Sequence, residues 1–376
     1  MAQRAIREFD AKRLIGAGGE GVLVGPGREV PRLGKGKWVI KPDELVGKRA
    51  KHGLVKVGNG EEIRAFLDEY RGKEVEISGV RDRLEYFLIE PFVEHEEEWF
   101  VAIRSSAEGD EILWSKQGGV EVEKQKPESI LVPLGKEYKG QWRDLYRKFV
   151  ELDFASLEIN PLAKAGSKFV PLDVKARLDD AAKFWHLKDW GEIEFPDPWG
   201  RRKLPEEKVI EALDEKSGAS LKLTVLNPKG RIWLLVAGGA ASVVYADTVV
   251  DLGYVKELAN YGEYSGNPSE EETYQYVKAF LSVMLKEGVK NKKLLIGGGV
   301  ANFTDVAKTF KGMVQALNEI SGELKKQGVE ILVRRGGPNY KEGLAMMEQF
   351  GQEGEIKVQV FGPETAMTKI INVCLQ

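Results

Sequence analysis

Two groups of residues have the types and the spacing needed for chemistry. The first group places polar side chains at the ends of, or inside, apolar segments: Lys41 in WVIKP, Glu158 and Asn160 in SLEINPL, and Asp173 in SKFVPLDVKARL. Carboxylates within apolar strands are costly unless they meet a cation, and magnesium prefers a few such oxygens together with nucleotide phosphates. The group therefore predicts an ATP site without a P-loop, or else a structural ion pair of Asp173 with Lys175 or Arg177.

The second group follows the apolar run Leu294 to Ile296. Three glycines come next, and a helix-like pattern then opens at Asn302, with Thr304 or Asn302 as the expected cap and Asp305 in the first turn. The first N–H groups of a helix have no partner within it and carry the positive end of its dipole. This arrangement predicts an anion site; the alternative is a tight turn that binds nothing.

A pair of arginines, Arg334 and Arg335, follows a third apolar run, Val329 to Val333, and precedes two glycines. A guanidinium offers paired donors in the geometry of a carboxylate. The pair therefore favours a carboxylate ligand, and the alternative is charge that faces solvent.

The C-terminal half alternates apolar runs with helical patterns. We expect strands at 232–236, 294–296, 329–333 and 357–361, and helices from Ser242, Ser269, Asn302 and Tyr340, then a last helix. Ser269 and Glu272 match a capping box, so the loop 259–268 should lead into a helix. Strands alternating with helices imply a parallel sheet covered on both faces, with ligands at the carboxyl ends of the strands.

The N-terminal half has a mixed pattern. We expect helices at 3–14, 61–70 and 141–151, strands at 36–45, 73–80 and 86–93, and a hairpin around 108–110. Gly16, Gly18 and Gly21 match G-x-G-x-x-G, but they follow a helix rather than a strand, so we do not expect them to touch a nucleotide. The proline-rich, charged stretch 191–208 indicates a linker. It divides the chain into domains 1–200, with a small subdomain at about 15–93, and 201–376.

Composition excludes several classes of function. A net charge of −3 argues against nucleic acid or an anionic membrane as the main partner. No apolar run approaches the ~20 residues of a membrane span, and the first residues lack a signal-peptide core, so we expect the cytosol. The single cysteine, Cys374, excludes an internal disulfide. The three histidines, His52, His95 and His186, show no metal-ligand spacing.

Longer blocks of sequence carry a family resemblance. Residues 214–343 resemble ATP-citrate lyase (ATP-citrate synthase), in the part similar to the succinyl-CoA synthetase β subunit, through DEKSGASLKLTVLNPKGRIWLLVAGG, ELANYGEYSGNPSEEETY, ANFTDVAKTFKG and RRGGPNYKEG. Upstream, VIKPDEL, FLIEPFVEH, GDEILWSKQGGVEV and LEINPL resemble its ATP-grasp part. The resemblance implies an α/β fold, with an ATP-grasp domain of two α+β subdomains followed by a flavodoxin- or Rossmann-like domain of the CoA-ligase type.

The resemblance also implies roles for individual residues. ATP would contact Lys41, Arg49, Ala50, Pro91, Val93, Glu98 and Asp173, with Pro91 and Val93 at the adenine and Glu98 at the ribose. Magnesium would be held by Asn160 and Asp173, and Asp214, Ser217 and Ala219 match a further metal-associated position. Citrate would bind at Gly266, Asn302, Phe303, Thr304 and Arg335. Ile320 replaces an expected citrate-contacting tyrosine and Gly299 a serine, so we expect weaker side-chain contacts with citrate.

The family reaction needs a phosphohistidine in a glycine-flanked loop, and none of the three histidines has such neighbours. The resemblance therefore implies a hetero-oligomer, in which a second subunit supplies the phosphohistidine, the CoA site and the citrate-synthase-like lyase domain, because this sequence stops before such regions. The other hypotheses are a β subunit of another acid–CoA ligase such as succinyl-CoA synthetase, a non-catalytic scaffold and, more distantly, a nicotinamide dehydrogenase.

Overall fold

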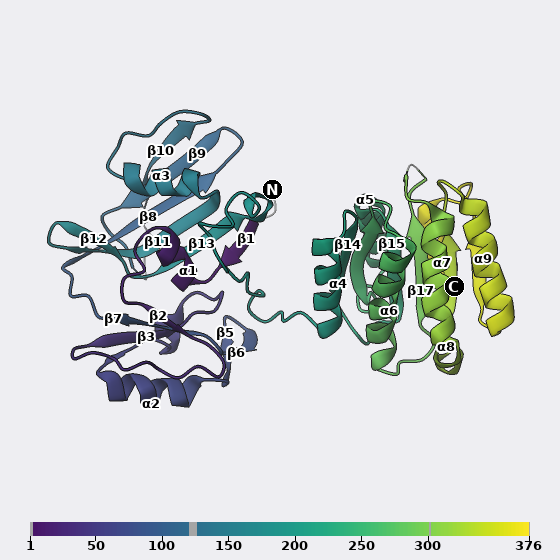
Figure 1. Cartoon of the computed structure of the whole chain (residues 1–376), viewed down its shortest axis with the longest axis horizontal. Helices are drawn as coiled ribbons and strands as arrows, with labels where there is room; N and C mark the ends of the chain where they lie inside the picture. The colour runs from purple at the N-terminus through teal and green to yellow at the C-terminus, as the bar shows by residue number, and fades with distance from the viewer. Residues whose placement is uncertain (1–2, 120–125, 301, 376) are drawn as a thin grey trace. The chain divides into compact units, whose positions relative to one another are not determined.

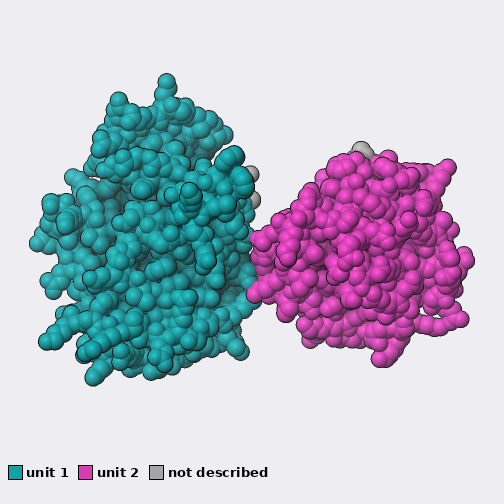
Figure 2. All heavy atoms as spheres, in the orientation of Figure 1, with its two compact units in different colours: residues 1–202 teal, residues 203–376 magenta. Residues whose placement is uncertain are grey.

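The computed structural model describes residues 3–119, 126–300 and 302–375. The ends of two sequence blocks, 120–122 and Ala301, lie outside these ranges. The chain forms two compact units, Met1–Arg202 and Lys203–Gln376, which Figure 2 colours teal and magenta. Each unit has its own hydrophobic core. In the described ranges, no helix is both long and apolar enough to cross a membrane.

Unit 1 contains a large antiparallel sheet of order β1-β13-β11-β8-β9-β10, with β12 paired to β11. The strands are β1 (Gln3–Ile6), β8 (Glu97–Ser105), β9 (Gly109–Ser115), β10 (Glu128–Pro133), β11 (Phe154–Ala165), β12 (Lys168–Pro171) and β13 (Val174–Asp179). Helices α1 (Glu8–Leu14) and α3 (Arg143–Glu151) pack on this sheet through residues such as Ala11, Leu14 and Phe149. Figure 1 shows this part of the unit above the smaller sheet.

The smaller sheet of unit 1 has the order β2-β7-β3-β4 and is covered by helix α2. Its elements are β2 (Val22–Val24), β3 (Trp38–Pro42), β4 (Lys56–Gly58), α2 (Gly60–Tyr70) and β7 (Phe87–Pro91), with the 3-10 helix η1 (Arg49–His52) after β3 and the hairpin β5 (Glu74–Ile77) and β6 (Val80–Arg83) beside them. A capping box between Asn59 and Glu62 fixes the start of α2. Helix α1 joins the two sheets, because its Lys12 bonds Glu90 of β7.

Unit 2 is built on the predicted parallel sheet, of order β15-β17-β18-β19. The strands are β15 (Ile232–Ala237), β17 (Lys293–Gly298), β18 (Glu330–Arg334) and β19 (Val358–Phe361). Alternate residues face two cores, so Leu295 packs with helices α5 (Gly239–Asp251) and α10 (Met367–Leu375), whereas Leu294 packs with α4 (Pro205–Lys216), α6 (Glu270–Lys286), α7 (Val306–Glu319), α8 (Ser321–Gln327) and α9 (Tyr340–Gly354). Both faces of the sheet are therefore covered.

Several local expectations were wrong, and tertiary pairing explains each. Residues 3–14 form strand β1 and helix α1 rather than one helix, because β1 pairs with β13. The stretch 73–80 turns into the hairpin β5–β6, and SKFVPLDVKARL forms two strands. The stretch 259–268 was expected to be a loop, but it contains β16 (Asn260–Ser265), which pairs antiparallel with β14 (Ser220–Val225). Helix α7 begins at Val306 rather than at Asn302.

Candidate functional site

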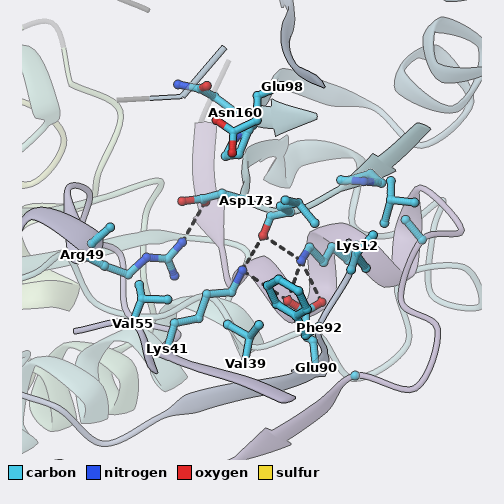
Figure 3. Close-up of a pocket in the computed structure, with 18 of the residues that line it drawn as sticks. Lys12, Val39, Lys41, Arg49, Val55, Glu90, Phe92, Glu98, Asn160 and Asp173 are labelled. Carbon is cyan, nitrogen blue, oxygen red and sulfur yellow. Dashed lines mark hydrogen bonds and ion pairs between the residues drawn. The ribbon is translucent and has the colours of Figure 1, made fainter. Parts of the chain in front are cut away.

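A cavity of about 750 Å³ lies in unit 1 and is lined from both of its sheets. The structure places all eight residues predicted for ATP and its magnesium on the wall of this cavity: Lys41, Arg49, Ala50, Pro91, Val93, Glu98, Asn160 and Asp173. Figure 3 shows Lys41, Arg49 and Asp173 reaching toward one another across it. Lys41 comes from the end of β3 and Arg49 from the start of η1, so short elements of the small sheet supply the cations.

Two lysines and two glutamates form a compact ionic cluster in the cavity. Lys41 Nζ lies 2.6 Å from Glu8 Oε1 and 3.2 Å from Glu90 Oε2. Lys12 Nζ lies 2.8 Å from the same Glu8 oxygen and 2.7 Å from Glu90. Both ammonium groups also donate to the carbonyl oxygen of Leu172. Glu8 and Glu90 therefore hold two cations at one point on the cavity wall.

Arg49 extends the cluster to the predicted metal residues. Its Nη2 lies 2.8 Å from Glu8 Oε2 and 2.7 Å from Asp173 Oδ1, and its Nη1 donates to the Pro42 carbonyl. Burial alone would raise the pKa of Glu8, but Lys41, Lys12 and Arg49 hold it well below its ordinary value. Burial would lower the pKa of Lys41, yet Glu8 and Glu90 raise it. Glu8 and Lys41 are therefore both charged at neutral pH.

Asp43 fixes the helix that carries Glu8 and Lys12. Helix α1 has no side-chain cap of its own, and the buried Asp43 carboxylate accepts hydrogen bonds from Glu8 N at 2.7 Å and Phe9 N at 3.0 Å. Burial and then the nearby Glu8 carboxylate raise the pKa of Asp43 to about 6. The end of β3 therefore aligns α1 by capping it from a distance.

Several residues of the ionic cluster were missed by the sequence analysis. Glu8, Lys12 and Glu90 had no motif, although the Glu8 and Lys12 spacing of four residues was a visible signal for an ion pair. The glycine-rich stretch, which we did not expect to touch a nucleotide, nevertheless lines the cavity through residues 17–21. The stretch lies between α1 and β2, so the dinucleotide fingerprint is still absent from it.

His95, which the sequence analysis did not assign to the ATP site, also lines the cavity. Its ring nitrogens lie 2.9 Å from the Val93 carbonyl oxygen and 3.1 Å from Glu98 Oε1. The hydrogen bond to Val93, and to a smaller extent Glu98, raises the pKa of His95. His95 therefore connects the two positions predicted for adenine and ribose.

The predicted magnesium residues Asn160 and Asp173 are joined by a backbone hydrogen bond from Asn160 N to Asp173 O of 2.9 Å. The Asn160 amide bonds the backbone of Gly119, and Asp173 pairs with Arg49 rather than with Lys175 or Arg177. Over the described ranges, no three His, Cys, Asp or Glu side chains form a metal cluster. A carboxylate and an amide oxygen beside buried cations nevertheless fit magnesium, which takes a few protein oxygens and the nucleotide phosphates.

Asp214, Ser217 and Ala219 belong to unit 2, whereas Asn160 and Asp173 belong to unit 1. The Asp214 carboxylate accepts from Leu221 N and from Lys222 Nζ. Ser217 Oγ accepts from Ala219 N at 3.0 Å. These contacts connect the end of α4 to β14. The observed roles of all three residues are therefore structural.

The residues predicted for citrate meet at the carboxyl ends of the parallel strands in unit 2. Asp305 N donates to Asn267 Oδ1 at 3.2 Å, which ties the Gly266 loop to the start of α7. A methyl group added to Gly337 would lie 2.9 Å from Asn302 O. The backbone at Asn302 therefore packs against the glycines that follow Arg335. Gly266, Asn302, Thr304 and Arg335 therefore belong to one region.

The start of α7 differs in detail from the expectation. Asp305 is the cap, since its carboxylate accepts from Lys308 N at 2.9 Å, and Asn302 Oδ1 accepts from Thr304 N in the preceding turn. Phe303 is 72% exposed, so its side chain points to solvent. Ile320 ends α7, roughly 20 Å from Val306 at the rise of an α-helix. The weakening of citrate contacts by Ile320 therefore stays a prediction, and the structure places Ile320 at the opposite end of α7 from Asn302 and Thr304.

The two arginines have opposite surroundings. Arg334 donates to the carbonyl oxygens of Gly298, Thr365 and Pro363. Arg335 is fully buried, and none of its three side-chain nitrogens has a hydrogen-bond partner among the described residues. A buried guanidinium without an acceptor is costly, which favours an anionic ligand at Arg335. The sequence favoured a carboxylate ligand for the pair, but the acceptors of Arg334 are backbone carbonyl oxygens.

Comparisons with known proteins identify the domains of the chain. Residues 201–376 match the family model described as ATP citrate lyase citrate-binding, and residues 27–142 match the ATP-citrate synthase ATP-grasp domain. The chain is 43% identical to ATP-citrate synthase alpha chain protein 2 of Arabidopsis thaliana, over 100% of this chain and 99% of that protein. It is 46% identical to ATP-citrate synthase of Bos taurus over 90% of this chain, but spans 33% of that longer protein.

A solved structure of ATP citrate lyase from Methanothrix soehngenii, in complex with citrate and coenzyme A, superposes with a TM-score of 0.91. The sequence identity is 46%, and the match covers 100% of both chains. This similarity confirms the predicted fold class, an ATP-grasp domain followed by a domain with a parallel sheet. The chain belongs to the ATP-citrate lyase family and carries its ATP-grasp and citrate-binding domains.

Proposed function

We propose that this chain binds Mg-ATP and citrate and passes a phosphoryl group between them through a histidine of a partner subunit. The γ-phosphoryl group moves from ATP to the imidazole nitrogen, and ADP leaves. A citrate carboxylate then takes the phosphoryl group to give citryl phosphate. The thiol of CoA displaces inorganic phosphate to form citryl-CoA, which is cleaved to acetyl-CoA and oxaloacetate.

The nucleotide half of the proposal assigns roles to the residues that line the cavity of unit 1. Lys41 and Arg49 would bind the phosphates, with the backbone of Ala50 beside them. Pro91 and Val93 would contact the adenine through backbone groups, and Glu98 the ribose. Asn160 and Asp173 would hold magnesium, which neutralises phosphate charge when bound. Asp214, Ser217 and Ala219 would form a further metal-associated position, in addition to their observed structural contacts.

The observation that carries the citrate half is the buried, unpartnered guanidinium of Arg335 in the unit that matches the citrate-binding model. Citrate carries three carboxylates, and Arg335 offers paired donors to one of them. The backbone of Gly266 and of residues 302–304 would surround the rest. Gly299 has open space around it and would leave this backbone cradle intact.

A partner that supplies the phosphohistidine is supported by the sequence, because no histidine of this chain has the glycine-flanked neighbours of the family's phosphohistidine loop. The structure gives the surroundings of the three histidines. His52 is exposed on η1. His95 bonds Val93 and Glu98, and His186 Nε2 lies 2.7 Å from Asp153 Oδ2. The partner would also supply the CoA site and the citrate-synthase-like lyase domain, in a cytosolic hetero-oligomer.

The experiment combines this chain with a partner subunit that carries such domains and measures oxaloacetate release. We expect release to require Mg-ATP, citrate, CoA and both chains. With radiolabelled ATP and both chains, the label should appear on the partner's histidine. Citrate cleavage by this chain alone would contradict the proposal. Release of heat with succinate rather than citrate in a binding titration would favour another acid–CoA ligase instead.

A further inference from the structure

Tyr264 is a fully buried tyrosine whose hydroxyl has no hydrogen-bond partner in the part of the chain that the structure describes. It lies on β16, two residues before Gly266 in the region of the candidate citrate site. Burial raises the pKa of Tyr264, and the charge that lowers it in part is that of Arg335. A methyl group added to Gly239 would lie 3.2 Å from Glu263 Oε2, and one added to Gly238 would lie 3.2 Å from Asn302 Nδ2. The end of β16 therefore lies close to the loop of Asn302.

Tyr245 on α5 is also fully buried, and its hydroxyl has no partner among the described residues, whereas a third buried tyrosine shows that the core around Tyr264 can satisfy such a group. Tyr276 is equally buried, and its ring centroid lies 6.4 Å from that of Tyr264. Its hydroxyl donates to the Lys222 carbonyl oxygen at 3.0 Å. The same core thus satisfies the hydroxyl of Tyr276 and leaves that of Tyr264 without an acceptor.

Thr304 adds a third polar side chain of the same kind. It is fully buried, and its hydroxyl has no partner among the described groups. Buried hydroxyl and guanidinium groups without partners are rare and unfavourable. With Tyr245, four such side chains among the described residues belong to unit 2, which indicates that a polar ligand completes hydrogen bonds of this group.

The chemistry of a carboxylate matches this set of donors. Its two oxygens offer about four acceptor positions, and a guanidinium fork uses two of them. A phenol and an aliphatic hydroxyl are suitable donors for the remaining two positions. Arg335, Tyr264 and Thr304 together therefore supply the donors that one buried carboxylate needs.

We propose that Tyr264 is a citrate-binding residue, whose hydroxyl donates to the carboxylate that Arg335 holds. This inference rests on the proposed function, because it adds a residue to the citrate site. It assigns the unpartnered hydroxyl of Tyr264 to recognition of the ligand and not to the stability of the core. The exposed fraction of Tyr264, which is 0%, also means that the carboxylate end of the ligand enters a region shielded from water.

The test compares Tyr264→Phe with Tyr276→Phe in the full chain, by titration calorimetry with citrate and by thermal unfolding. We expect Tyr264→Phe to raise the Kd for citrate by about tenfold or more, because it removes a hydrogen bond to a charged group. Its Tm should stay the same or rise. Tyr276→Phe should leave the Kd unchanged and lower the Tm by about 2–4 °C, because it removes a satisfied hydrogen bond.

An unchanged Kd in Tyr264→Phe overturns the inference, and so does a raised Kd accompanied by a Tm loss like that of Tyr276→Phe, since a structural role explains that result. Arg335→Ala separates the inference from the proposed function. If Arg335→Ala abolishes citrate binding while Tyr264→Phe binds as wild type does, the inference alone fails. If the wild-type chain binds no citrate, the proposed function and the inference about Tyr264 both fail.

Discussion

Arg334 and Arg335 are neighbours in the sequence, but the structure satisfies one guanidinium and leaves the other without an acceptor. Arg334 donates to three carbonyl oxygens, of Gly298, Pro363 and Thr365, and so fastens the end of β18 to the strand and the loop beside it. Arg335, completely buried, meets no acceptor within the described residues. The first arginine therefore builds the site and the second is available for the ligand.

Gly298→Ala should weaken citrate binding without removing any polar group. A methyl group at Gly298 would overlap the guanidinium of Arg335, which must then shift. We expect the Kd for citrate to rise by about 10- to 100-fold, the cost of misplacing hydrogen bonds to a charged ligand. Titration calorimetry measures the change.

Gly299→Ala is the matched control for this substitution. An added methyl group at Gly299 meets nothing within 4 Å, and its backbone conformation does not require glycine. The control should bind citrate as the wild type does. Equal affinities in both variants would show that the position of Arg335 does not govern binding.

Glu8→Gln should destabilise unit 1 and increase the rise in Tm that Mg-ATP causes. Glu8 neutralises Lys12, Lys41 and Arg49, and breaking a buried ion pair costs about 3–5 kcal/mol. Phosphate oxygens can replace the lost charge, so Mg-ATP should raise the Tm of the variant more than that of the wild type. Glu44→Gln, at a carboxylate that bonds the backbone of Glu85 and Tyr86, should show no such gain. Equal shifts in all three proteins would refute this role for Glu8.

Asp173→Asn should raise the magnesium concentration needed for ATP binding. Asp173 supplies a charged oxygen beside Asn160, and the loss of that charge should increase the requirement by on the order of tenfold or more. A magnesium titration of ATP binding provides the measurement. Asp110→Asn is the control, since that carboxylate bonds Ser105 and Tyr146. An unchanged magnesium dependence in Asp173→Asn would remove Asp173 from the metal site.

Asp43 should make the stability of unit 1 depend on pH. Its pKa is about 6 in the folded chain against an ordinary value of 3.8, so its contribution to stability is fully present below pH 3.8 and is lost as the pH rises through about 6. Relative to Asp43→Asn, which does not titrate, the wild type should lose up to about 3 kcal/mol of unfolding free energy across this window. Thermal unfolding at several pH values tests this difference.

Asp82→Asn serves as the comparison, because the contribution of Asp82 to stability should depend on pH in the opposite direction. Burial alone would raise the pKa of Asp82, but hydrogen bonds from Arg83 N, Gly200 N and Arg202 lower it. Its contribution is therefore present above pH 3.8 and is lost as the pH falls below that value. If both variants showed the same pH dependence, the surroundings assigned to Asp43 would be wrong.

The parallel sheet of unit 2 could be predicted because its signals are local. Apolar runs mark the strands, glycines follow them, and the Ser269 capping box starts α6 as expected. Strand β16 could not be predicted in this way. The side-chain amide of Asn260 bonds both backbone groups of Leu234 and continues the sheet, and its partner strand β14 lies far back in the sequence.

The sites were predictable to different extents for physical reasons. Lys41 and Asp173 could be found because a charged group within an apolar run is unusual. Glu8 and Lys12 resemble an ordinary surface pair, and their burial depends on β7 and on the Leu172 segment folding over them. Periodicity also cannot decide which of Arg334 and Arg335 lacks an acceptor, because the acceptors come from the loop after β19.

A crystal structure of the chain with citrate tests the central claim most directly. The account predicts one citrate carboxylate within about 3.2 Å of the Arg335 guanidinium and the Tyr264 hydroxyl, beside Asn302 and Thr304. Citrate bound elsewhere, with Arg335 still lacking an acceptor, would contradict it.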